Sequence, residues 1–199
     1  MLCLLYGEER YLLETKLKKF KKEFGEMING INFVQIDADT ISELISDIET
    51  PAFGYPTKLI VAKNTGLFKK EKRASKSKSA KTDAKEDKKK VNSLEEKVAN
   101  YIDEHNEIFK DDVTLIFVEE EVDKNLLYKV IEKYGEVTNF ELLKMPQLID
   151  NIRKICGAYK VNIDFDVAKY FVESCGTSMQ DLINEIRKLI EFARSWTEI

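Results

Sequence analysis

Short apolar runs alternate with helical patterns over the first 140 residues, and this order restricts the chain to few folds. Strand-like runs are expected at 2–6, 33–36, 58–62, 113–118 and 136–140. The fourth run is apolar almost without interruption, as in strands that are buried on both faces. Because parallel neighbours need crossover connections, the alternation predicts an α/β fold, with a parallel five-stranded sheet flanked by helices.

Four helical segments separate these runs. Apolar residues at helical spacing predict a first helix that ends at Gly25. Capping boxes at 40–43 and 93–96 predict the starts of the second and third helices, and the third is expected to end near His105. The fourth helix stops at Gly135.

Beyond residue 145 the strand-like runs cease, and helical segments are expected at 146–158, 164–175 and 178–194. The last segment places six apolar residues on one face, as in the core side of a small three-helix bundle. They are Met179, Leu182, Ile183, Ile186, Ile190 and Ala193. The sequence therefore predicts an α/β domain over 1–141 and a helical domain over 142–199.

Positive charge is concentrated in one segment of a chain whose formal net charge is -4. Residues 69–90 hold eleven Lys or Arg against four Asp or Glu, without an aromatic or branched aliphatic residue. Such a segment cannot form a core, so we expect a disordered insertion. Its lysines could contact DNA phosphates, but the lack of interleaved aromatics favours a solubilising insertion.

Composition also bears on the compartment and on metal sites. There is no membrane-length apolar stretch and no signal peptide, so a cytoplasmic protein is expected. The cysteines Cys3, Cys156 and Cys175 are odd in number and far apart, and His105 is the only histidine. This pattern favours buried thiols and a surface histidine over disulfides or a zinc site.

The carboxyl ends of parallel strands are the usual place for a ligand, and a phosphate loop would follow the first strand there. Gly7 is followed by Leu12, Leu13 and Glu14, where such a loop requires glycine, lysine and a hydroxyl residue. Glu14 would repel a phosphate. Nucleotide hydrolysis is therefore not expected, and no cofactor is implied.

Acidic residues follow two of the expected strands. Glu8 and Glu9 follow the first, and Glu119 begins three consecutive glutamates after the fourth. They could hold magnesium, but adjacent acids on an extended chain point to alternating sides. The third strand also ends at 62–64 without the aspartate that a phosphoacceptor domain needs. A solvated strand end is favoured over a metal or catalytic role.

The segment Thr50-Pro-Ala-Phe-Gly-Tyr-Pro56 breaks the second helix and leads into the third strand. Its prolines and glycine restrict the backbone, while two aromatic residues lie where solvent is expected. A rigid turn can present Phe53 to a partner. The other interpretation is that Phe53 packs under its own sheet. Tyr55 has the same ambiguity, and its hydroxyl favours a rim position.

Three segments together resemble the delta subunit of bacterial DNA polymerase III, a clamp-loader subunit. They are Leu4-Leu-Tyr-Gly-Glu-Glu-Arg-Tyr-Leu-Leu-Glu14, the stretch 50–64, and Asp181-Leu-Ile-Asn-Glu-Ile-Arg-Lys-Leu189. The resemblance runs through the chain in the same order. It implies an AAA+-like domain without ATP hydrolysis, followed by a helical lid-like domain. The family's third domain, a collar that assembles with the other loader subunits, is expected to be absent here.

The resemblance also implies a function in DNA replication. Delta subunits bind the sliding clamp, the beta subunit of the polymerase, and open it like a wrench, whereas DNA is reached only indirectly through the loader. The family's clamp contact is a hydrophobic pair on a short helix before the third strand, which maps onto Ala52 and Phe53. Pro51, Gly54 and Tyr55 would form the rim. The family commonly has a larger residue at the first position, so Phe53 is expected to carry more of the anchoring.

Two alternatives from other classes stay open at this point. One is a DNA-binding module that uses the 69–90 lysines. The other is a magnesium-dependent phosphotransfer enzyme that uses Glu8, Glu9 and Glu119.

Overall fold

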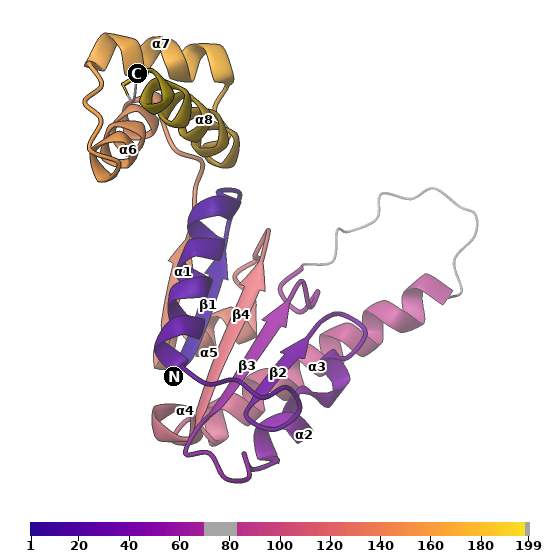
Figure 1. The fold of residues 1–199 in the computed structure, drawn as a ribbon. Helices are drawn as coiled ribbons and strands as arrows, with labels where there is room; N and C mark the ends of the chain where they lie inside the picture. The colour runs from indigo at the N-terminus through magenta and orange to yellow at the C-terminus, as the bar shows by residue number, and fades with distance from the viewer. Residues whose placement is uncertain (70–82, 198–199) are drawn as a thin grey trace, which may run out of the picture. The chain divides into compact units, whose positions relative to one another are not determined.

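Five parallel strands form one sheet in the computed structural model, which describes the backbone of residues 1–69 and 83–197 (Figure 1). The strand order is β2-β3-β4-β1-β5. The strands are β1 (Leu2–Tyr6), β2 (Phe33–Ile36), β3 (Lys58–Lys63), β4 (Val113–Glu119) and β5 (Glu136–Asn139). All four neighbouring pairs are parallel, so the expected α/β class is confirmed.

Helices cover both faces of this sheet. They are α1 (Arg10–Phe24), α2 (Leu44–Glu49), α3 (Asp83–Glu104), α4 (Ile108–Asp111) and α5 (Leu126–Tyr134). Successive strand residues point to opposite faces and divide the core into two clusters. In the first, Leu4 and Phe117 pack with apolar residues of α2 to α5. In the second, Leu5 and Ile116 pack with apolar residues of α1.

The α3 helix begins at Asp83, ten residues before the expected capping box at 93–96. Residues 83–90 are therefore helical, contrary to the expected disordered insertion. Alanine, lysine and glutamate are strong helix formers, which explains how this polar stretch extends the helix before residue 93. The rest of the basic segment, 70–82, lies outside the described residues. The expectation that its lysines contact DNA or solubilise the chain therefore stays a prediction.

The expected capping box at 40–43 does not form. The Thr40 hydroxyl lies 2.9 Å from the Asp37 carboxylate and accepts the Asp37 backbone N–H at 3.0 Å. It makes no capping hydrogen bond, and a single 3₁₀ turn, η1 (Ile41–Glu43), precedes α2. Threonine at this position supports the preceding turn instead, as short hydroxyl side chains often do.

Three helices follow the sheet and pack around their own core: α6 (Met145–Ala158), α7 (Phe165–Cys175) and α8 (Met179–Thr197). This confirms the expected three-helix bundle. Five of the six apolar residues predicted for the last helix are buried, but Ala193 is exposed. It lies one turn beyond Ile190, the last residue of the packed core.

The chain divides into two compact units. The first consists of Met1–Glu8 and Leu13–Phe140, and the second of Glu9–Leu12 and Glu141–Ile199. Within the described ranges 1–69 and 83–197, no helix is long and apolar enough to cross a membrane.

Candidate functional site

The segment that contains Phe53 joins the end of α2 to the start of β3. It therefore lies at the amino edge of the sheet, where all the parallel strands begin. The loop after β1 and the glutamates after β4 lie at the carboxyl edge. The two candidate sites of the sequence thus occupy opposite edges of one sheet.

A tight turn shapes this segment. The Tyr55 backbone N–H donates to the Ala52 carbonyl at 2.9 Å, and Gly54 has a φ of +83°. A positive φ at the third position is the mark of a type II turn, which places Phe53 at the second position. The pair Ala52 and Phe53 thus lies on a turn and not on the short helix that the resemblance implied. Gly54 supplies the left-handed conformation that other residues adopt at a cost.

The Phe53 side chain is 77% exposed, the largest exposed fraction among the large apolar side chains that the structure describes. The interpretation of Phe53 as a core residue is therefore wrong. Ala52 and Tyr55 are half-buried, whereas Pro51 and Gly54 are exposed. An exposed aromatic ring on a restricted turn is a feature of protein-binding surfaces rather than of a folded core.

Lys58, the first residue of β3, holds the chain just before the turn by hydrogen bonds to its backbone. Its ammonium donates to the backbone carbonyls of Asp47 at 2.6 Å and Thr50 at 3.2 Å, and the side chain is only 3% exposed. Burial lowers the pKa of Lys58, while nearby Asp47 acts in the opposite direction. A cation at this place satisfies carbonyl groups at the end of α2 that have no partner within the helix.

Lys58 was missed by sequence reasoning, because a lysine at a strand end is usually solvated. The one local indication of a buried role is that Lys58 follows the proline-containing segment 50–56, which turns the chain back toward the sheet.

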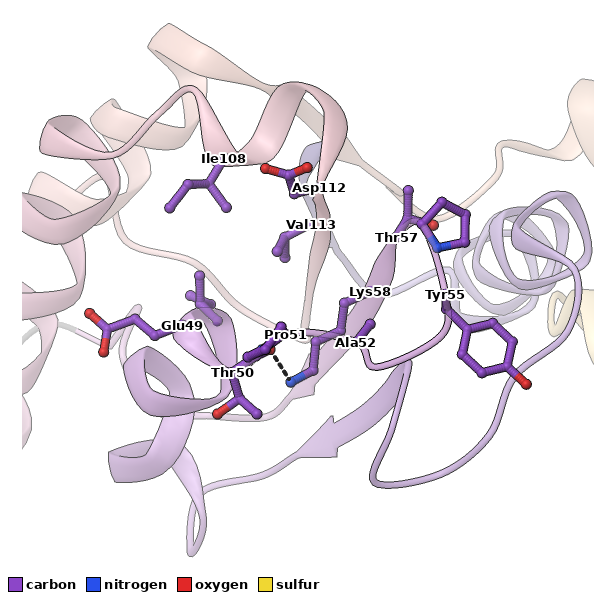
Figure 2. A pocket seen from close by; sticks show the side chains of 12 residues that line it. Glu49, Thr50, Pro51, Ala52, Tyr55, Thr57, Lys58, Ile108, Asp112 and Val113 are labelled. Atoms are coloured by element: carbon purple, nitrogen blue, oxygen red, sulfur yellow. Dashed lines mark hydrogen bonds between the residues drawn. The ribbon is translucent and has the colours of Figure 1, made fainter.

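A pocket of about 330 Å³ opens beside the turn (Figure 2). Pro51, Ala52 and Tyr55 contribute to its wall from the turn itself. The rest of the lining is Ile48, Glu49, Thr50, Pro56, Thr57, Lys58, Ile108, Asp112 and Val113. The pocket thus combines residues from α2, α4 and the starts of two strands.

The carboxyl edge offers little to a phosphate. A side chain on Gly7 would collide with the Phe140 backbone, so the loop after β1 packs tightly against the end of β5. Leu13 is buried in the sheet core, Leu12 is half-buried, and Glu14 pairs with Lys63 at 3.0 Å. These positions provide neither the glycine, the free cation nor the hydroxyl that a phosphate loop uses.

Glu119 is buried, so the expectation of a solvated strand end is wrong. Its carboxylate accepts hydrogen bonds from the Thr65 backbone N–H at 2.8 Å and the Thr65 hydroxyl at 2.7 Å. Burial raises the pKa of Glu119, and the Thr65 hydrogen bonds oppose that rise. The carboxylate therefore joins the end of β4 to the turn after β3, an arrangement that local sequence does not reveal.

Glu8 and Glu9, the other acids of the magnesium hypothesis, differ in burial. Glu9 is 4% exposed and accepts from the Tyr11 backbone N–H at 3.3 Å, whereas Glu8 is exposed. Burial raises the pKa of Glu9. Among the described residues, no three His, Cys, Asp or Glu side chains are grouped as metal ligands.

The cysteines differ in exposure. Cys3 and Cys156 are buried as expected, but Cys175, at the end of α7, is exposed. Cys175 is the last residue of α7, one turn beyond Val172, the last buried residue of that helix. His105 is exposed and stacks on Tyr101, with ring centroids 4.4 Å apart.

A family model described as "DNA polymerase III, delta subunit" matches residues 3–140. Among curated proteins, a probable DNA polymerase III subunit delta of Aquifex aeolicus is 25% identical over 197 residues, covering 95% of this chain and 49% of that protein. Among solved structures, the Bacillus subtilis DNA clamp loader delta protein has a TM-score of 0.63 at 19% identity. That match covers 97% of this chain and 54% of the other. The chain thus spans about half the length of either relative.

Proposed function

The chain belongs to the DNA polymerase III delta subunit family, and we propose that it binds a sliding clamp through Phe53 and opens the clamp during DNA replication. The observation that carries this proposal is the exposure of Phe53, at 77%, on a hydrogen-bonded turn. Other clamp-loader subunits are the further partners to be expected, and a replication role is a cytoplasmic one.

Phe53 has the properties of a binding anchor. A phenylalanine ring that enters a partner's pocket removes a large apolar surface from water, and truncation of such an anchor typically costs about 2 kcal/mol or more. The turn and the Lys58 hydrogen bonds hold the segment before the partner arrives. Preorganisation of this kind lowers the entropy lost on binding. Ala52 contributes little surface, so Phe53 carries most of the anchoring.

Clamp opening needs no nucleotide chemistry in this subunit. A protein that binds the open or strained form of a ring more tightly than the closed form shifts the equilibrium toward opening. Only the difference in affinity between the two forms does this work. Leu13 is buried in the sheet core and Glu14 pairs with Lys63, where a phosphate loop requires a lysine and a hydroxyl residue. This supports an ATP-independent role for this chain.

The test is the binding of a Phe53→Ala variant to the sliding clamp by calorimetry. We expect the affinity to fall by about 30-fold or more, the equivalent of about 2 kcal/mol. Phe192→Ala is the matched control, because Phe192 is 63% exposed but belongs to α8. Both variants should keep the far-UV circular dichroism of the parent. Unchanged clamp affinity of Phe53→Ala would refute the proposed site.

A further inference from the structure

The pocket beside the turn is continuous with the proposed clamp-binding surface. Pro51, Ala52 and Tyr55 form one wall of the pocket, and Ala52 and Tyr55 close the turn that presents Phe53. A partner that takes up Phe53 would therefore also cover the neighbouring pocket. A hollow of about 330 Å³ that is covered but left empty forfeits favourable contacts. A side chain of the partner is the natural occupant.

The pocket wall is suited to the aliphatic part of a long side chain. Ile48 of α2, Ile108 of α4 and Val113 of β4 line it, together with Pro51 and Ala52. Figure 2 shows Ile108 and Val113 on the opposite side of the pocket from Pro51 and Ala52. Val113 and Ile48 are buried, with 5% and 4% exposure. They provide a fixed apolar surface rather than one that must be ordered on binding.

The charged residues of the lining favour a cation. Glu49 and Asp112 are both exposed at the pocket. The lining also contains one cation, Lys58, but its ammonium is buried and donates to two backbone carbonyls. Glu49 also accepts a hydrogen bond from the Tyr101 hydroxyl. The accessible charge is therefore acidic.

We propose that this pocket receives a lysine or arginine side chain of the sliding clamp when Phe53 is bound. The stem lies along Ile48, Ile108 and Val113, and the cationic end reaches Glu49 and Asp112. Long basic side chains combine an apolar stem with a charged tip, which matches this lining. The inference rests on the proposed function, since it takes the clamp as the partner.

The test is clamp binding by a Glu49→Gln/Asp112→Asn double variant at low and high salt. The variant keeps the shape of both side chains but removes both charges. We expect an affinity about 3- to 10-fold weaker at low salt, because exposed charge pairs are individually modest. The affinity of the variant should also depend less on salt than that of the parent, since salt screens exposed charges. Of the two single variants at position 112, Asp112→Lys should bind more weakly than Asp112→Asn, because it places a like charge beside the incoming cation.

The matched control is Asp39→Asn/Glu43→Gln, which removes one aspartate and one glutamate from exposed positions between β2 and α2. It changes the net charge equally and should leave affinity and salt dependence at parental values. Circular dichroism verifies the fold of each variant.

The outcomes separate this inference from the proposed function. If Phe53→Ala loses binding while the Glu49/Asp112 double variant binds as the parent does at both salt concentrations, the pocket assignment is wrong and the Phe53 site stands. Tighter binding by the double variant would mean that the clamp places an acidic or neutral group there, and it also overturns the assignment. If Phe53→Ala binds normally, the proposed function itself fails.

Discussion

A buried carboxylate is costly unless hydrogen bonds compensate for lost hydration, and Glu119 receives two such bonds from Thr65. Burial nevertheless raises the pKa of Glu119 above its ordinary value of 4.5. Between 4.5 and the raised pKa, the folded state binds more protons than the unfolded state. The free energy of unfolding should therefore fall as the pH rises through this window.

The Glu119→Gln variant should show a smaller loss of stability over that window, because the amide has no proton to release. Urea denaturation from pH 4.5 upward measures the effect. Some slope should remain, since burial also raises the pKa of Glu9. Glu121→Gln is the control, because Glu121 is exposed on the same glutamate run and its removal should leave the slope unchanged. Equal slopes for the parent and Glu119→Gln would contradict the buried position of this carboxylate.

The three thiols should differ sharply in reactivity. Burial raises the pKa of Cys3 to about 12 and also raises the pKa of Cys156, whereas Cys175 is exposed. Because the thiolate is the reactive form, the native protein should release one equivalent of chromophore quickly from Ellman's reagent. The other two equivalents should appear only after denaturation. A Cys175→Ser variant that still showed the fast phase would disprove this assignment.

At the scale of elements, Lys58 connects the end of α2 to the start of β3 and fixes the segment between them. A Lys58→Met variant keeps the length of the side chain but leaves two carbonyls without their donor. Unpaired groups of this kind cost about 1–3 kcal/mol when they stay buried. We expect weaker clamp binding with an unchanged sheet, because the Phe53 turn loses its support.

The control for Lys58→Met is Lys63→Met, at the other end of the same strand. Lys63 pairs with Glu14 and lies at the carboxyl edge, away from the turn. Its removal should leave clamp affinity at the parental value. Calorimetry compares the two variants, and a parental affinity for Lys58→Met would show that the turn holds its shape without the ammonium.

The helices and strands that could be predicted from the sequence are those whose hydrophobic periodicity extends over enough consecutive residues to be recognised. All five strands, α1, α5 and the three helices of the bundle follow from periodicity and from glycines at helix ends. The four residues of α4 are too short to show a helical period. The capping box at 40–43 failed because Thr40 had a competing partner in Asp37.

The candidate site was only partly visible in the sequence for a similar reason. Prolines and Gly54 mark the turn within seven residues, so its position and its aromatic ring could be inferred locally. The pocket wall also needs Ile108 and Val113, which follow Phe53 by more than fifty residues. Long-range packing of this kind, like the burial of Lys58 and Glu119, is set by the fold and leaves no local pattern.

At the scale of the whole molecule, the sheet and its two apolar clusters are built from residues up to Phe140. The bundle has a separate cluster of its own. Glu9–Leu12 is the one stretch before Phe140 that groups with the second unit. A unit with its own core can in principle fold alone. We therefore propose that residues 1–140 form an independent domain that carries the complete Phe53 site and its pocket.

A fragment of residues 1–140 should unfold cooperatively and bind the sliding clamp with an affinity within about threefold of the whole chain. The reason is that Phe53, Lys58 and every residue of the pocket wall lie within it. Thermal unfolding followed by circular dichroism tests the first expectation, and calorimetry with the clamp tests the second. A fragment that folds but binds much more weakly would assign part of the clamp surface to the second unit. A fragment that fails to fold would show that the sheet depends on the bundle, despite the separate cores.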